Sequence, residues 1–129
     1  IADPQLFEQL ENHGPTSLTQ LVTDAVQVKV DVVQEDPFEQ GRRAVLNLGH
    51  TFGQAIEWVS ELEVGHGEAI AVGLVAAAHL AESMGRCSPE LVKRTIDLLE
   101  KVELPTSVRD FEVDAIMDAM WYDKKRKGK

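Results

Sequence analysis

Apolar residues recur every three or four positions along almost the whole chain, which is the spacing of helices. The valine-rich stretch 26–33 also fits a strand, but the length of the run around it favours a helix. No other segment suggests a strand, so the pattern predicts an all-α fold of about six helices in a compact bundle. The expected helices cover residues 4–12, 17–34, 43–60, 67–84, 89–102 and 112–122.

Residues that favour helix ends mark several of these boundaries. Asp3 is a suitable N-cap before Pro4, and Ser88 stands in the same relation to Pro89. Gly85 follows the fourth predicted helix, where glycine commonly ends a helix. These local signals agree with the boundaries that the periodicity indicates.

One narrow polar stripe runs along the predicted helix over residues 43–60. On a wheel of 100° per residue its members fall within about 80° of one another, and the other positions are apolar or small. This predicts a helix that is buried almost all round. A stripe that simply faces water is the alternative, but Lys and Glu would then be expected in bulk. The stripe consists of Arg43, Asn47, His50, Gln54 and Glu57.

Two glycines and a second histidine add to this pattern. Gly49 and Gly53 share another face of the same predicted helix, and because glycine costs about 1 kcal/mol there, they predict a closely packed neighbour. The next helix is apolar over residues 69–78 and should form the centre of the core. His66 lies at its start and could converge with His50 on a metal. A cap or loop role is the simpler interpretation of His66 alone, and catalytic zinc usually has three protein ligands.

Lys29 interrupts the apolar stripe of the helix over residues 17–34. Most such lysines extend to water, and a minority point the ammonium into a cleft. His13 precedes a turn and His79 suits the edge of the core, so neither indicates a ligand.

Charge and composition exclude some classes of function. The net charge of −9 argues against nucleic-acid binding, which needs a cationic surface. Residues 123–129 hold five Lys or Arg and one Asp, which leaves −13 on residues 1–122; this basic tail is either solvated or half of an anion site. The longest apolar run has ten residues, whereas a membrane span needs about 20. Cys87 is the only cysteine, which fits a reducing compartment and predicts a cytoplasmic protein.

Two histidine-centred stretches closely resemble signatures of the 3-dehydroquinate synthases, a family of sugar-phosphate cyclases. Residues 41–57 read GRRAVLNLGHTFGQAIE and residues 66–73 read HGEAIAVG, in that family's order and spacing. Residues 123–125, DKK, resemble a third signature. The resemblance extends over nearly the whole chain and implies that residues 1–129 are the helical, metal-binding C-terminal domain.

The resemblance implies an enzyme with a second domain. An N-terminal domain, which binds NAD, is expected to be missing from this chain, which begins at Ile1, so the segment alone should be inactive. The full-length parent is expected to be a phosphate-eliminating lyase of the shikimate pathway and a homo-oligomer. Its substrate is a seven-carbon phosphorylated keto acid, which it converts to 3-dehydroquinate. Zinc, or another divalent metal such as cobalt, would act as a Lewis acid.

The resemblance also assigns roles to polar residues of the first two signatures. His50 and His66 match the imidazole ligands of the metal. Arg43 and Asn47 match groups that hold the anionic ends of the substrate.

Further roles fall outside these four residues. Lys29 and Glu39 match catalytic residues near the substrate hydroxyls, and one of Lys124 and Lys125 matches a phosphate-binding lysine. Gln54 stands where the family usually has a second histidine. Glutamine can donate a hydrogen bond to phosphate but supplies no positive charge.

Three departures from the family's pattern bear on function. The family's third metal ligand, a glutamate, lies in a motif just before the matching segment and is absent here, and no NAD motif is present. The third departure, Gln54, leaves room for a related cyclase that acts on another sugar phosphate, as in aminocyclitol biosynthesis. A non-catalytic acidic helical module for protein interaction is the third possibility.

Overall fold

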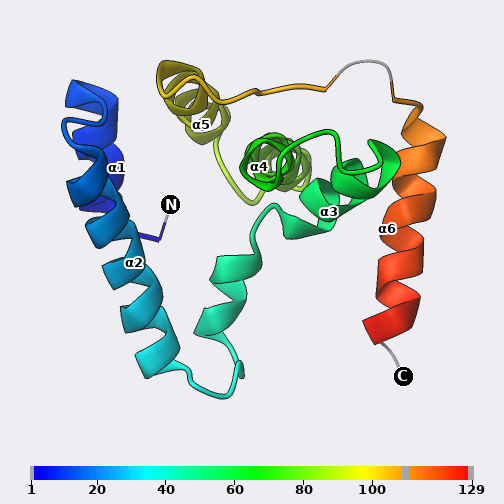
Figure 1. Cartoon of the computed structure of the whole chain (residues 1–129), viewed down its shortest axis with the longest axis horizontal. Coiled ribbons are helices and arrows are strands. Elements are labelled where there is room, and N and C mark those ends of the chain that lie inside the picture. The colour runs from blue at the N-terminus through cyan, green and yellow to red at the C-terminus, as the bar shows by residue number, and fades with distance from the viewer. Residues whose placement is uncertain (1, 109–110, 128–129) are drawn as a thin grey trace. The chain divides into compact units, whose positions relative to one another are not determined.

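The computed structural model describes residues 2–108 and 111–127, and the side chains of these as far as residue 122 (Figure 1). The described residues form helices and no strand, which confirms the all-α class, and the valine-rich stretch lies inside α2. The chain divides into two compact units, Ile1–Asn47 and Leu48–Lys129, and each is described by itself. The elements are α1 (Pro4–His13), α2 (Leu18–Glu35), the 3-10 helix η1 (Arg42–Asn47), α3 (His50–Val59), α4 (His66–Ser83), α5 (Pro89–Lys101) and α6 (Val113–Lys127).

The predicted helix ends are confirmed by their hydrogen bonds. The Asp3 carboxylate accepts from the backbone N–H groups of Gln5 and Leu6, at 2.8 and 3.1 Å, and so caps α1. The Ser88 hydroxyl accepts from the Leu91 N–H at 3.3 Å and caps α5. Gly85 has a φ of 67° directly after the C-cap of α4, a left-handed conformation that glycine adopts without strain.

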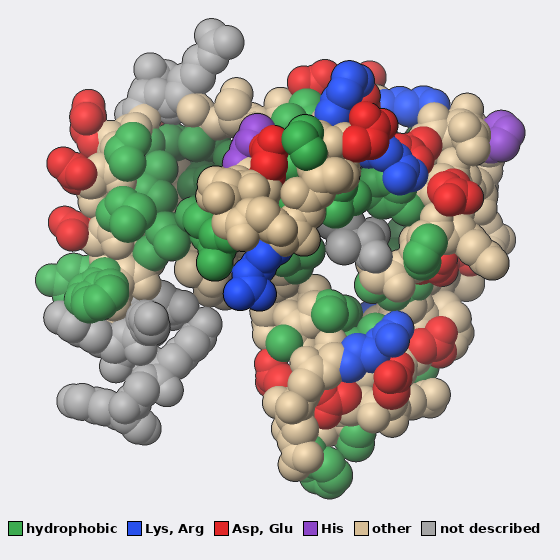
Figure 2. All heavy atoms as spheres, turned by 180° about the vertical axis from the view of Figure 1, so that it is seen from behind, with side chains coloured by type: hydrophobic (Ala, Val, Ile, Leu, Met, Phe, Trp, Pro, Cys, Tyr) green, Lys and Arg blue, Asp and Glu red, His purple; other side chains and the backbone are tan. Residues whose placement is uncertain are grey.

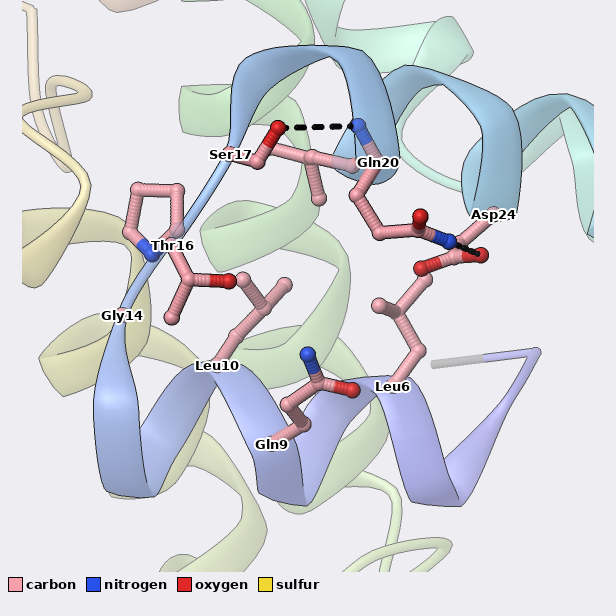
Figure 3. A pocket seen from close by; sticks show the side chains of 10 residues that line it. Leu6, Gln9, Leu10, Gly14, Thr16, Ser17, Gln20 and Asp24 are labelled. Carbon is pink, nitrogen blue, oxygen red and sulfur yellow. Dashed lines mark hydrogen bonds between the residues drawn. The ribbon is translucent and has the colours of Figure 1, made fainter.

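The first unit consists of α1, α2 and η1. The start of α2 lies beside α1 and borders a small pocket (Figure 3). The α2 groups that line the pocket are already paired, since the Gln20 amide donates to Asp24 at 2.8 Å and the Gln20 N–H donates to the Ser17 hydroxyl. An ion pair of 3.0 Å joins Arg42 of η1 to Glu35 at the end of α2.

The second unit is built around α4. This helix contacts α3 and α5, and Figure 1 shows it between them, with α6 beyond α3. Ile56, Ala69 and Val72 form the centre of the core, and the partly buried Val64 and Ile116 pack against them. The apolar composition of α4 predicts a central core helix, and this prediction is confirmed.

Gly49, directly before α3, and Gly53 within it let the backbone lie directly against α4, as predicted. A Cβ at Gly53 would lie 2.6 Å from Cδ1 of Ile70, and one at Gly49 would lie 2.8 Å from the backbone N of Leu74. Gly73 of α4 completes the contact, because a Cβ there would lie 2.2 Å from the carbonyl oxygen of Gly49. No larger residue fits these positions without moving the helices apart.

Residues 43–60 do not form the single helix that their spacing predicts. Gly49 has a φ of 80°, so the helical path is broken between η1 and α3. The expectation of burial all round is also wrong, because Val45, Leu48 and Trp58 are 45%, 43% and 73% exposed. A helical wheel assumes one uninterrupted rotation, whereas the close approach of Gly49 to α4 requires a left-handed residue. The polar stripe is thus divided between η1 and α3.

Apolar side chains also gather on the surface of α6 (Figure 2). A groove of about 650 Å³ lies between α6 and the end of α3, and it is lined by Trp58, Leu62 and Tyr122, with Glu61 and Asp118 among its polar members. None of the helices in the described part of the chain combines the length and the apolar character that crossing a membrane requires.

Candidate metal and substrate site

His50 and His66 lie together in the second unit, as predicted. Their rings meet edge to face, with centroids 5.7 Å apart and planes at 64°. His50 is the first residue of α3 and His66 is the first residue of α4. Ser60 orders the connection between these helices, because its hydroxyl donates to the Glu57 carbonyl at 3.0 Å and accepts from the Val64 N–H at 3.3 Å.

Both rings have Nδ1 within hydrogen-bond distance of an acceptor, and neither Nε2 atom has a hydrogen-bond partner among the described residues. Nδ1 of His66 is 3.0 Å from Oε1 of Glu57, and Nδ1 of His50 is 3.3 Å from the carbonyl oxygen of Leu48. A carboxylate and a carbonyl accept hydrogen bonds and donate none, so each bond needs a proton on Nδ1. In the neutral imidazole the lone pair then lies on Nε2, where a metal binds.

This donor set fits part of a zinc site. Imidazoles that share a zinc ion at about 2.0–2.1 Å have ring centres about 5 Å apart, close to the separation of His50 and His66. Within residues 2–108 and 111–122, however, no three His, Cys, Asp or Glu side chains are grouped to hold a metal. The two histidines would therefore offer two ligands, and a complete site would need at least one more.

Gln54 lies one turn after His50 on α3 and is exposed. Residues four apart on a helix share a face, so the Gln54 amide and the His50 imidazole point to the same side of α3. Glu57 follows three residues later on this face. The part of the predicted stripe that lies on α3 is thus retained.

A loop organised by Asp36 carries the site residues of the first unit. The Asp36 carboxylate accepts from the backbone N–H groups of Arg43, Gln40 and Gly41, at 3.0, 2.8 and 2.8 Å. These hydrogen bonds, that of Arg43 first, hold the pKa of Asp36 below its usual value because they favour the ionised carboxylate. Sequence reasoning missed this residue, although an Asp before a Pro is a common turn signal.

This loop and η1 carry three of the predicted site residues, Glu39, Arg43 and Asn47. The Asn47 amide donates to the Glu39 carboxylate at 3.0 Å. The Arg43 guanidinium donates to the carbonyl of Pro37 at 3.0 Å. Glu39 adopts a φ of 55°, a conformation that costs a non-glycine residue free energy and that recurs at functional sites.

The remaining predicted residues are less constrained. Lys29 is exposed on α2. Lys124 and Lys125 belong to α6, but the structure describes only their backbone. The site residues thus form one group in each unit: Glu39, Arg43 and Asn47 in the first, and His50, Gln54, Glu57 and His66 in the second.

Sequence comparison places this geometry in a known context. The family model described as 3-dehydroquinate synthase C-terminal matches residues 1–126. The 3-dehydroquinate synthase of Corynebacterium jeikeium is 44% identical over 127 residues, covering 98% of this chain and 33% of the relative. That of Neisseria meningitidis is 43% identical over 138 residues, covering 99% of this chain and 38% of the relative. The chain therefore spans about a third of the length of the relatives that it matches.

A solved structure has a similar fold. The 2-epi-5-epi-valiolone synthase ValA of Streptomyces hygroscopicus subsp. jinggangensis 5008, solved with NAD⁺ and Zn²⁺ bound, matches with a TM-score of 0.79 and 25% identity. The match covers 96% of this chain and 37% of that protein. The fold is thus shared between this chain and an enzyme that carries both cofactors.

Proposed function

The chain belongs to the 3-dehydroquinate synthase C-terminal family, and we propose that it supplies the metal- and substrate-binding half of a 3-dehydroquinate synthase. The observation that carries this proposal is the pair His50 and His66, whose rings converge with both Nε2 atoms available. The complete activity also needs an NAD-binding domain, which fits a chain that spans about a third of its relatives. The reaction would convert a seven-carbon phosphorylated keto acid to 3-dehydroquinate with loss of phosphate.

The chain's own residues would bind and orient the substrate. The guanidinium of Arg43 suits a carboxylate or phosphate, since it presents several N–H donors in one plane. Asn47 and Glu39, which hydrogen-bond to each other, offer amide and carboxylate groups to the substrate hydroxyls. Gln54 would donate to the phosphate, and Lys29 and one of Lys124 and Lys125 would add positive charge.

Zinc or another divalent metal, when bound, would polarise an oxygen of the substrate as a Lewis acid. His50 and His66 would hold it through Nε2. The remaining ligands would come from the rest of the enzyme. With two imidazoles only, this chain should bind zinc weakly.

A related cyclase that acts on another sugar phosphate is the second candidate. The match to ValA and the glutamine at residue 54 both favour it. Arg43 and Asn47, which the resemblance assigns to the anionic ends of the substrate, favour the keto acid, because a simple sugar phosphate lacks the carboxylate and so has one anionic end fewer. In a full-length enzyme, a higher kcat/KM for the keto acid than for such a sugar phosphate would support the first function.

The metal site can be tested on this chain by nitrogen-15 NMR of the imidazole rings during zinc titration. We expect the signals of His50 and His66 to shift together at high zinc concentration. His13, at the end of α1 in the first unit, and His79, in the last turns of α4, serve as internal controls. Equal shifts at all four histidines, or none at His50 and His66, would contradict the proposed metal site.

A further inference from the structure

Glu57 is a polar residue of the α3 stripe to which the family resemblance gives no role. Its side chain is only 18% exposed, whereas that of His66 is 62% exposed. A carboxylate that has lost most of its hydration needs a hydrogen-bond donor. Oε1 of Glu57 finds one in Nδ1 of His66, at 3.0 Å. The contact therefore satisfies the carboxylate and at the same time fixes a ring that is otherwise largely open to water.

We propose that Glu57 is a positioning residue, which holds His66 in the Nδ1-protonated form and directs its Nε2 atom at the metal. The inference rests on the proposed function of His50 and His66. An ionised carboxylate can only accept, so the bond selects one of the two neutral tautomers of the ring. Partners of this kind commonly fix the tautomer and orientation of histidines that bind metals.

The placement of Glu57 suits this role. It lies seven residues after His50 on the same helix, and its bond to His66 joins α3 to the first residue of α4. The Glu57 carbonyl is also anchored, since it accepts from the Leu62 N–H at 2.9 Å and from the Ser60 hydroxyl at 3.0 Å. The carboxylate thus approaches His66 from the last turn of α3, directly before an internally bonded connection.

Two other roles for Glu57 make different predictions. As a mere tie between helices, it would fix the same tautomer and affect stability, but its loss would leave the zinc affinity unchanged. As a metal ligand, it would bind zinc directly, and its loss would weaken zinc binding whether or not His66 is present. The tautomer without metal and the zinc affinity together separate these roles from the proposed one.

The first experiment is nitrogen-15 NMR of the imidazole rings of this chain, without metal, at a pH where His66 is neutral. In the wild type, His66 should carry its proton on Nδ1. Glu57→Gln keeps an oxygen acceptor and should retain most of this form, whereas Glu57→Ala should lose the preference. Glu63→Gln removes an exposed charge from the same connection and should leave the tautomer unchanged. An unchanged His66 tautomer in a folded Glu57→Ala variant overturns the proposal.

The second experiment measures zinc affinity in a double-mutant cycle. Glu57→Ala should weaken zinc binding about 10- to 100-fold in the wild-type background, the usual effect of losing such a partner. In a His66→Ala background the same change should have less than about a twofold effect. An equal loss in both backgrounds overturns the proposal, because Glu57 would then act independently of His66. Failure of zinc to bind the wild type would instead overturn the proposed metal site, since the tautomer is measured without metal.

Discussion

At the scale of single residues, the chemistry of the candidate site depends on which side-chain atoms already have hydrogen-bond partners. His50 and His66 each engage Nδ1 with an acceptor and leave Nε2 available. Asp36 accepts from three backbone N–H groups of the loop that carries Glu39 and Arg43. The acceptors at Nδ1 select one neutral tautomer of each imidazole, and the backbone hydrogen bonds favour the ionised form of Asp36. Substitution of one of these residues or of its partner should therefore have a specific effect.

Gln54 gives the first prediction, in a full-length synthase that carries this domain. Gln54→Leu should lower kcat/KM about tenfold, equivalent to about 1.4 kcal/mol, because the phosphate loses a donor. Gln54→His should maintain or raise turnover, since an imidazolium makes a charge-assisted hydrogen bond. Thr51→Val, at an exposed position of α3, is the control and should match the parent in steady-state kinetics. If Gln54→Leu also matches the parent, Gln54 does not face the phosphate.

Asp36 gives a prediction about pH. Its pKa in the folded chain is lowered by hydrogen bonds, so its carboxylate stabilises the fold above the unfolded pKa of about 3.9. This contribution should be lost as the pH falls through the folded pKa, which lies below that value. Denaturant unfolding of wild type and Asp36→Asn at pH 7 and pH 3 tests it. The wild type should be the more stable at pH 7 and the difference should shrink at pH 3; a difference that grows as the pH falls would contradict the account.

At the scale of elements, the contact between α3 and α4 positions the two histidines. Gly49, Gly53 and Gly73 bring the backbones together, and His50 and His66 follow at the starts of the two helices. Any side chain in this contact must push the helices apart. The contact should therefore be sensitive to the smallest enlargement.

Gly73→Ala tests this contact. The new methyl group would lie 2.2 Å from the Gly49 carbonyl oxygen, so the variant should lose about 1–3 kcal/mol of unfolding free energy. Gly67→Ala is the matched control in the same helix, because a Cβ there has nothing within 4 Å, and it should be neutral or stabilising by up to about 1 kcal/mol. Denaturant unfolding measures both. Equal effects of the two substitutions would show that the helices do not pack as closely as described.

These elements also show what can be predicted from sequence. Asp3, Ser88 and the periodic apolar positions act over one or two turns, so helix existence and helix ends follow from local patterns. The break at Gly49 does not, because this left-handed residue lies in a close contact with α4, whose residues are distant in the sequence. The hydrogen bonds that Asp36 accepts likewise depend on the path of the loop as far as Arg43, which local patterns do not determine. The helices and their ends were therefore predictable from sequence, the roles of the site residues stay a prediction, and the partners of Glu57 and Asp36 required the structure.

At the scale of the whole molecule, each of the two units holds a group of candidate site residues, and no three His, Cys, Asp or Glu side chains among the described residues are grouped to hold a metal. By itself the chain should form no 3-dehydroquinate at any concentration of NAD and zinc, because an NAD-binding domain and further ligands are needed. A coupled assay for 3-dehydroquinate checks this. Product above background would mean that the chain is catalytically sufficient, against the present account.

The central claim is that this chain can serve as the metal- and substrate-binding half of a synthase. The most direct measurement replaces the matching third of the Corynebacterium jeikeium enzyme, which is 44% identical over 127 residues, with this chain and assays 3-dehydroquinate formation from the phosphorylated keto acid. The chimera should be active, and it should lose its activity on His50→Ala or His66→Ala. A folded, NAD-binding chimera that forms no product, or one that stays active without both histidines, would contradict the claim.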